Sequence, residues 1–235
     1  MKPYFETKLG RLWHGDCLEG MKHIHGVDLV LTDPPYGIKM DKGFEGFEGF
    51  GGFGEPIARK QYPDSWDSKR PQKECFEFML RISKNALIFG GNYFADLLPI
   101  STHWIVWDKL NTMPTFGDCE LIWTNINRKS VKKYTCQYNG LLGKESVRVH
   151  PTQKPVKLII SLLENYSEIK DMILDPFLGS GTTAIACERL NRRWIGIEIS
   201  EEYCEIAARR IEAETKQLKL FLSTIKQPEE AKHGS

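Results

Sequence analysis

The sequence predicts an α/β protein with a Rossmann-like, doubly wound, seven-stranded and mostly parallel sheet that carries a hairpin at one edge. Short apolar runs alternate with amphipathic helical patterns, which is typical of a parallel sheet covered by helices on both faces. Two runs with no helix between them, Trp104–Trp107 and Glu120–Thr124, predict the antiparallel edge hairpin. Two other apolar runs lead into Asp33 and Asp175, which places a carboxylate at the end of the strand where open α/β sheets bind ligands.

Each predicted strand is a short and mostly apolar run. In chain order the runs are Arg11–His14, Asp28–Thr32, Asn85–Gly90, Trp104–Trp107, Glu120–Thr124, Met172–Asp175 and Trp194–Glu198. Three helices are expected between or after them, because the apolar residues recur on one helical face. These helices are Lys73–Ser83, Val156–Tyr166 and a long helix that Ser200 caps.

A single domain of residues 1–235 is the expected organisation. Of the 235 residues, 41% are hydrophobic and 27% are charged, which suits one α/β core. No apolar run approaches the ~20 residues that cross a bilayer, and the first residues lack the apolar core of a secretion signal. The six cysteines form no Cys-x-x-Cys pair, so we expect buried thiols in a reducing cytoplasm and no metal site.

Two segments fall outside the alternation of strands and helices. Residues 43–55 contain six glycines and four phenylalanines, a density of glycine that cannot hold a regular element. Because this repeat closely follows Tyr36, we interpret residues 41–70 as a mobile lid; a disordered insertion is the alternative. Residues 125–149 are basic, and we interpret them as a short target-recognition segment.

The segment after the strand Met172–Asp175 is interpreted as a cofactor loop. Residues 179–184 satisfy the G-x-G-x-x-A dinucleotide fingerprint, and Glu198 follows at about the expected offset. A dinucleotide is disfavoured, because Asp175 would repel a pyrophosphate and only about one βαβ unit follows. S-adenosylmethionine fits better. Asp175 can accept its ammonium, the amides of residues 180–183 its carboxylate, and Glu198 its ribose diol.

The other strand-end carboxylate begins the motif Asp33-Pro34-Pro35-Tyr36. An exocyclic amine on a base is a poor nucleophile, because its lone pair is delocalised into the ring. Two acceptors on its hydrogens, the Asp33 carboxylate and the Pro34 carbonyl, would direct the lone pair toward an electrophilic methyl group. Consecutive prolines stiffen that carbonyl, and Tyr36 offers a ring face for stacking on a base. An ordinary turn with a core tyrosine is the alternative.

The order of these segments predicts a permuted sheet. Too few residues follow Glu198 to complete it, so the missing strands must come from the amino-terminal half. Arg11–His14 would then lie beside the cofactor, with Asp16 near the adenine amino group; a plain surface position is the alternative for Asp16. The arrangement requires Asp33 and the loop at Gly179 to meet at one pocket.

Three motifs in sequence carry a family resemblance: Asp33–Tyr36, His150-Pro151-Thr152-Gln153-Lys154-Pro155 and Asp175–Thr183. They resemble the DNA amino-methyltransferases that modify adenine N6 or cytosine N4, in the permuted order of the β group, over about residues 12–211. The resemblance implies a circularly permuted methyltransferase fold and S-adenosylmethionine as cofactor. It also implies that Thr152 and Lys154 lie near the methionine end of the cofactor, where Lys154 could neutralise the carboxylate. Phosphate contact or helix capping is the alternative for Thr152.

The candidate site residues form three groups. The catalytic candidates are Asp33, Pro34, Pro35 and Tyr36. The cofactor-binding candidates are Asp16, Cys17, Asp33, Thr152, Lys154, Asp175, Phe177, Gly179, Ser180, Gly181, Thr182, Thr183 and Glu198. The DNA-binding candidates are Lys129, Lys132, Lys133, Tyr134, Lys144 and Arg148. They come from a stretch with eight Lys/Arg and one acid between residues 128 and 157. A solvated basic loop is the alternative for this stretch.

The expected function is site-specific methylation of adenine N6 in DNA, on a base flipped out of the duplex. Cytosine N4 is the nearest alternative, and Asp rather than Ser before Pro-Pro favours adenine. An RNA amino-methyltransferase and a non-catalytic DNA-binding module are further alternatives. The expected partner is double-stranded DNA, and a homodimer and a cognate restriction nuclease are compatible with the resemblance.

Overall fold

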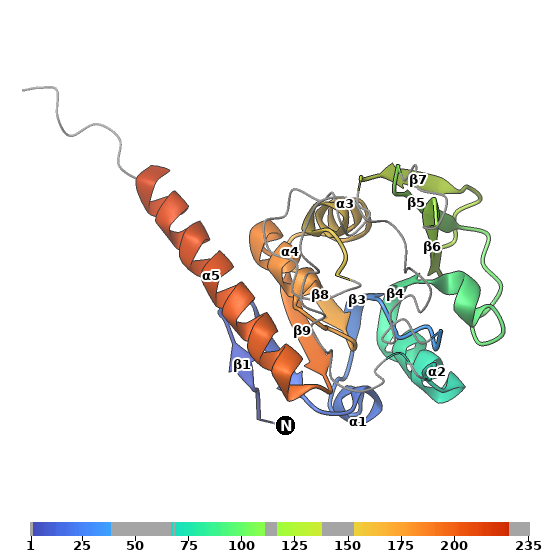
Figure 1. Cartoon of the computed structure of the whole chain (residues 1–235), viewed down its shortest axis with the longest axis horizontal. Coiled ribbons are helices and arrows are strands. Elements are labelled where there is room, and N and C mark those ends of the chain that lie inside the picture. Colours follow the sequence, from blue (N-terminus) through green and yellow to red (C-terminus); the bar gives the residue numbers. More distant parts are fainter. Residues whose placement is uncertain (1, 39–66, 68, 111–116, 138–152, 226–235) are drawn as a thin grey trace, which may run out of the picture.

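The structure is a computed structural model, and it describes residues 2–38, 67, 69–110, 117–137 and 153–225 (Figure 1). Helices cover both faces of a central mixed sheet. The strands are β1 (Phe5–Glu6), β2 (Gly10–His14), β3 (Val27–Thr32), β4 (Ser83–Phe89), β5 (Trp104–Asp108), β6 (Cys119–Thr124), β7 (Lys132–Thr135), β8 (Met172–Asp175) and β9 (Arg193–Glu198). The helices are α1 (Cys17–Met21), α2 (Lys73–Ile82), α3 (Val156–Tyr166), α4 (Thr182–Leu190) and α5 (Glu201–Ile225), with a 3-10 turn η2 (Gly91–Phe94).

The strand order in the sheet is β1-β2-β9-β8-β3-β4-β6-β5-β7. The two carboxyl-terminal strands β8 and β9 therefore lie between the amino-terminal strands β2 and β3, and all four run parallel. This confirms the predicted permutation. Because parallel strands end at the same edge of a sheet, the segments that follow β3, β8 and β9 are brought together.

All seven predicted strands are present, but the predicted number of strands is wrong. The described residues hold nine strands, because β1 and β7 join the sheet. β1 pairs antiparallel with β2. It has only two residues, which are too few to form a pattern in the sequence. β7 has the sequence Lys-Lys-Tyr-Thr, which lacks the apolar alternation of a buried strand. Lysines on an edge strand keep it from pairing with another chain.

Two apolar cores lie on opposite faces of the sheet. Helices α3, α4 and α5 cover one face, and α1, α2 and η2 cover the other (Figure 1). Along β3, Leu29 and Leu31 belong to the first core and Val30 to the second, so this strand is buried on both sides. Such double burial explains why its sequence is a continuous apolar run.

The hairpin of β5 and β6 is antiparallel, as predicted. It is not the outermost part of the sheet, because β7 pairs in parallel with the outer side of β5. Trp107 and Trp123 on these strands are each 1% exposed and belong to the core. No helix in the described ranges is long and apolar enough to cross a membrane.

The predicted lid, residues 41–70, lies outside the described residues except for Asp67, Lys69 and Arg70. Asp67 is buried, and its carboxylate accepts a hydrogen bond of 2.8 Å from the backbone amide of Gly37. Arg70 donates to both carboxylate oxygens of Asp96 at 2.8 and 2.9 Å. These contacts hold the carboxyl-terminal end of the segment against the rest of the domain, next to the residue that follows Tyr36. The lid itself stays a prediction.

Candidate active site

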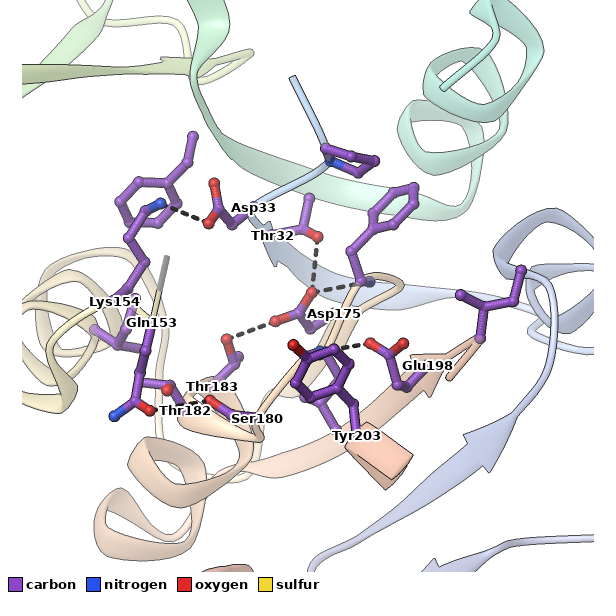
Figure 2. A pocket seen from close by; sticks show the side chains of 17 residues that line it. Thr32, Asp33, Gln153, Lys154, Asp175, Ser180, Thr182, Thr183, Glu198 and Tyr203 are labelled. Atoms are coloured by element: carbon purple, nitrogen blue, oxygen red, sulfur yellow. Dashed lines mark hydrogen bonds and ion pairs between the residues drawn. The ribbon is translucent and has the colours of Figure 1, made fainter. Parts of the chain in front are cut away.

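A cavity lies at the carboxyl ends of β3, β8 and β9, where α4 begins (Figure 2). Asp33 reaches it from the end of β3, and Gly179 from the loop after β8. The two sequence motifs therefore meet at one cavity, as the permuted order requires. The described lining residues are Thr32, Asp33, Pro35, Phe89, Gln153, Lys154, Ile159, Asp175, Phe177, Leu178, Gly179, Ser180, Thr182, Thr183, Glu198, Ile199 and Tyr203.

Asp175, the last residue of β8, is buried at the centre of this lining. One carboxylate oxygen accepts hydrogen bonds from the Thr32 hydroxyl at 2.7 Å and the Phe177 amide at 3.1 Å. The other accepts from the Thr183 hydroxyl at 2.7 Å. Burial raises the pKa of Asp175 to about 6, although the two hydroxyl donors oppose this shift. The carboxylate is thus held in a fixed orientation and is ionised near neutral pH.

Glu198 ends β9 and holds the loops around it in place. Its two carboxylate oxygens accept from the amides of Gly179 and Ser200, both at 2.8 Å. Burial raises its pKa, and these amide donors oppose the shift. A Cβ added at Gly179 would meet no atom within 4 Å, so the backbone there borders open space that a ligand can approach. Gly181, at φ 86°, turns the chain into α4.

Asp33 lies at the opposite side of the cavity and belongs to a polar cluster. Its Oδ1 accepts from the Tyr36 hydroxyl at 2.6 Å, and its Oδ2 accepts from the Lys154 ammonium at 2.5 Å. Lys154 also lies 3.3 Å from a carboxylate oxygen of Glu120, which in turn pairs with Lys109 at 2.7 Å. The Lys154 side chain is 8% exposed. Lys154 lines the cavity, and its ion pairs join it to Asp33 and Glu120; its place at the methionine end of the cofactor stays a prediction.

These charges set the ionisation of the cluster. Burial raises the pKa of Asp33, and the neighbouring Lys154 ammonium opposes that shift. Burial alone would raise the pKa of Glu120, but Lys154 and Lys109 hold it below its usual value. Burial would lower the pKa of Lys154, whereas Asp33 and Glu120 raise it above its usual value. Lys154 is therefore a cation held between two carboxylates.

Tyr36 has a more enclosed position than the sequence indicates. Its ring stacks on Tyr93 with centroids 4.6 Å apart, so one ring face is already covered. A Cβ at Gly90, which has φ 66°, would lie 2.3 Å from the Tyr36 ring. Glycine at this position therefore makes room for the tyrosine. Pro35 lines the cavity, while Pro34 and Tyr36 lie outside its lining.

Asp16 and Cys17, predicted to bind the cofactor, follow β2 and lie outside the lining of the cavity. Because β2 pairs His14 with Glu198, Asp16 and Cys17 lie just beyond that edge of the site. Asp16 is the N-cap of α1, accepting from the amides of Leu18 and Glu19 at 2.9 and 3.1 Å. The thiol of Cys17 lies 3.6 Å from the thiol of Cys75.

Residues that the sequence did not single out also belong to the site. Glu120 and Lys109 complete the cluster around Lys154. Gln153 accepts a hydrogen bond of 3.4 Å from the Ser180 hydroxyl, and Arg210 on α5 donates to the same hydroxyl at 2.8 Å. The signal for Glu120 is weak, because a single acid at the start of a strand looks like a boundary. Arg210 lies on an amphipathic helix with many charges, where no pattern distinguishes it.

The basic segment is described only up to residue 137, and Lys144, Arg148 and Thr152 lie outside the described residues. Lys129 and Lys132 are exposed, and Lys133 pairs with Asp108 at 3.0 Å. The ring of Tyr134 is half-buried and lies 6.5 Å from that of Tyr166. Tyr134 thus packs against the core, and its role in DNA binding stays a prediction.

Comparison with known proteins places this geometry in context. Residues 99–209 match the family model for N6 and N4 methyltransferases, described as DNA methylase. The chain is 26% identical over 258 residues to the type II methyltransferase M.HinfI of Haemophilus influenzae, covering 90% of this chain and 70% of that protein. It is 28% identical over 263 residues to the type II methyltransferase M2.DpnII of Streptococcus pneumoniae, covering 92% and 94%.

Two solved structures share the fold. The M1.HpyAVI–SAM complex has a TM-score of 0.61 and 24% sequence identity, covering 86% of this chain and 99% of that one. The cytosine-N4-specific PvuII DNA methyltransferase has a TM-score of 0.59 and 17% identity, covering 92% and 95%. At these identities the likeness concerns the fold. It confirms the α/β architecture predicted from the sequence.

Proposed function

Because this chain is related to the DNA amino-methyltransferases of adenine N6 and cytosine N4, we propose that it methylates adenine N6 in double-stranded DNA with S-adenosylmethionine. One observation carries the proposal. The acid after β3 and the glycine loop after β8 line the same cavity. A methyl donor on one side and an acceptor amine on the other would then meet between Asp33 and Gly179.

The residues present fit S-adenosylmethionine. When bound, it supplies an electrophilic methyl group on a sulfonium. Asp175 offers a buried carboxylate for an ammonium, and Glu198 a second one for a diol. The open backbone at Gly179 and the first amides of α4 suit a carboxylate. We retain Phe177 and Ser180–Thr183 as contacts, and Asp16, Cys17 and Thr152 as untested candidates at the ends of the site.

The acceptor side suits an amine on a flat base. Asp33 would accept one N–H of the target amine. The carbonyl of Pro34, the residue between the lining residues Asp33 and Pro35, would accept the other, which directs the nitrogen lone pair at the methyl group. Asp33 can then take the proton that the nitrogen loses once the new N–CH3 bond has formed. The surrounding protein desolvates this carboxylate, so its charge acts in a site of low dielectric, where it needs no reorganisation. A base inside a duplex must be flipped out to reach it.

Adenine and cytosine present the same chemistry to Asp33, so both belong to the test. Aspartate before Pro-Pro favours adenine, whereas the fold is shared with a cytosine-N4-specific enzyme. Plasmid DNA is incubated with the protein and methyl-labelled S-adenosylmethionine, and the nucleosides are then separated. Label in N6-methyladenine is expected. Label in N4-methylcytosine would overturn the choice of base, and the absence of label from both would overturn the proposed function.

Further experiments sharpen this test. Asp33→Ala should abolish methyl transfer while the affinity for DNA stays within about twofold, because Asp33 lines the cavity and not the outer surface. Retained activity in this variant would contradict the proposal.

The methylation assay carried out on RNA distinguishes an RNA amino-methyltransferase, and sedimentation with and without DNA tests the proposed homodimer. A cognate restriction nuclease stays part of the proposal, to be sought among proteins that cleave the same DNA unmethylated.

A further inference from the structure

The cluster around Asp33 contains more charge than an acceptor site needs. Two hydrogen-bond acceptors, the Asp33 carboxylate and the Pro34 carbonyl, would suffice for the target amine. Yet a lysine ammonium lies 2.5 Å from its Oδ2, and that lysine contacts a second carboxylate, Glu120, at 3.3 Å. Lys109 completes the set by pairing with Glu120 at 2.7 Å. Two acids and two lysines thus form a neutral group beside the cavity.

Lys154 is built into this place. Its side chain is 8% exposed, and its ammonium lies over the rings of Tyr36 and Phe89, at 5.6 and 5.2 Å from the centroids. Burying an ammonium is strongly unfavourable unless it is paired and hydrogen-bonded. Asp33 and Glu120 provide that pairing, and the aromatic faces add to it. An ammonium so held is a fixed part of the site.

A desolvated carboxylate without a counter-charge tends to take up a proton. The consequence at Asp33 would be direct, because a protonated carboxyl group presents a donor where the target amine needs an acceptor. The groups that face Asp33 are Lys154, Tyr36, Glu120 and, across the cavity, Asp175. Among them Lys154 is the cation, and the two acids disfavour ionisation of Asp33.

We propose that Lys154 is a positioning residue that acts as the permanent counter-charge of Asp33, and that Glu120 holds the Lys154 ammonium in this position. The inference rests on the proposed function, since it assigns Lys154 a role in that reaction. It differs from the role implied by the family resemblance, in which Lys154 neutralises the carboxylate of the cofactor. The two roles separate in kinetics. A counter-charge governs the rate and its pH dependence, and a cofactor ligand governs KM for the cofactor.

The test compares full-length wild type with Lys154→Met, Lys154→Arg and Glu120→Gln. Single-turnover rates and KM for S-adenosylmethionine are measured between about pH 5.5 and 9.5. In Lys154→Met the acidic limb of the rate should move up by at least one pH unit, which lowers the rate at a given pH on that limb about tenfold and leaves the rate at alkaline pH unchanged. Lys154→Arg should keep the wild-type limb, and Glu120→Gln should move it part of the way.

Lys73→Met is the matched control, because Lys73 is an exposed lysine on α2 that does not line the cavity. Its pH profile should coincide with that of wild type. Circular dichroism and binding of S-adenosylmethionine show whether each variant is folded. A Lys154→Met variant that keeps the acidic limb in place and raises KM for the cofactor would overturn the inference and assign Lys154 to the cofactor.

A second measurement does not require activity. Carboxyl-labelled aspartate is followed by carbon NMR through a pH titration, and Asp33→Asn identifies the Asp33 signal. In Lys154→Met the midpoint of that signal should rise by at least one pH unit, about tenfold in proton affinity. An unmoved midpoint would overturn the counter-charge. If wild type transfers no methyl group, the proposed function fails, while the titration still decides whether Lys154 keeps Asp33 ionised.

Discussion

The hydroxyl of Thr32 donates a hydrogen bond of 2.7 Å to the carboxylate of Asp175, a residue 143 positions later in the chain. Strands β3 and β8 are neighbours in the sheet, and this bond joins their carboxyl ends. Thr32 directly precedes Asp33, so the acid of the cofactor side is oriented by the residue that leads into the acceptor side. A change at Thr32 should therefore affect cofactor binding.

Thr32→Val should weaken the binding of S-adenosylmethionine about tenfold. Valine has nearly the same shape, but it removes a hydrogen bond to a charged group, which is worth about 1.5 kcal/mol. Asp175 would lose one of its two hydroxyl donors and bind an ammonium in a less fixed orientation. Titration calorimetry measures the affinity. Thr215→Val on α5, away from the cavity, is the control, and equal affinity in the two variants would contradict the role of Thr32.

Binding of S-adenosylmethionine should weaken as the pH falls through about 6. Burial raises the pKa of Asp175 to about 6, and the ammonium of the cofactor binds the ionised carboxylate. Below that pKa the ionised fraction falls about tenfold per pH unit, and the affinity falls with it. From about one unit above that pKa, the affinity should stay constant until the ammonium of the cofactor loses its own proton near pH 8. Fluorescence or calorimetric titrations at several pH values measure this. In Asp175→Asn the affinity should be low and independent of pH between about 5 and 8.

Most of the sheet could be predicted because its strands are buried on both faces. β3, β8 and β9 are continuous apolar runs that end in Thr32, Asp175 and Glu198. The sequence also indicates that these three strand ends border a binding site, because parallel sheets bind ligands at the carboxyl ends of their strands. β7 could not be predicted in this way. Its residues are mostly exposed and basic, and it becomes a strand because the outer side of β5 offers it unpaired backbone groups.

The cluster around Asp33 also depends on tertiary structure. Lys154 precedes α3, Glu120 lies in the hairpin, and Asp33 follows β3, so no local pattern joins them. A family motif places Lys154 in the site but does not choose its partner. The partner follows from burial, because a buried ammonium requires nearby carboxylates and Asp33 and Glu120 are within reach.

Gly90→Ala should reduce methyl transfer at least tenfold while leaving the affinity for the cofactor nearly unchanged. Gly90 has φ 66°, and an added Cβ would lie 2.3 Å from the Tyr36 ring. Strain of this backbone costs about 1–2 kcal/mol, and Tyr36 must shift and give up its hydrogen bond to Asp33. Single-turnover kinetics and calorimetry measure both effects. Gly26→Ala is the control, since a Cβ there meets just the Ile82 carbonyl, at 3.9 Å.

The strand β7 and the turn before it supply the last prediction. Lys129 and Lys132 are exposed and are close in the chain to Lys133, whose ammonium already pairs with Asp108. If these lysines bind DNA phosphates, replacing Lys129 and Lys132 with alanine should flatten the dependence of log Kd on log salt by about one unit for each phosphate that is no longer neutralised. Lys133→Ala should have a smaller effect, because a paired lysine releases fewer counterions.

Fluorescence anisotropy with duplex DNA at several salt concentrations measures these slopes. The control is the double variant Lys2→Ala and Lys8→Ala, which removes the same charge from two exposed lysines near the amino terminus. Equal slopes in the two double variants would mean that net charge, and not β7, governs binding. A flatter slope for the β7 variant alone would assign this edge of the sheet to the DNA backbone and leave the reading of bases to other residues, since phosphate contacts carry no sequence information.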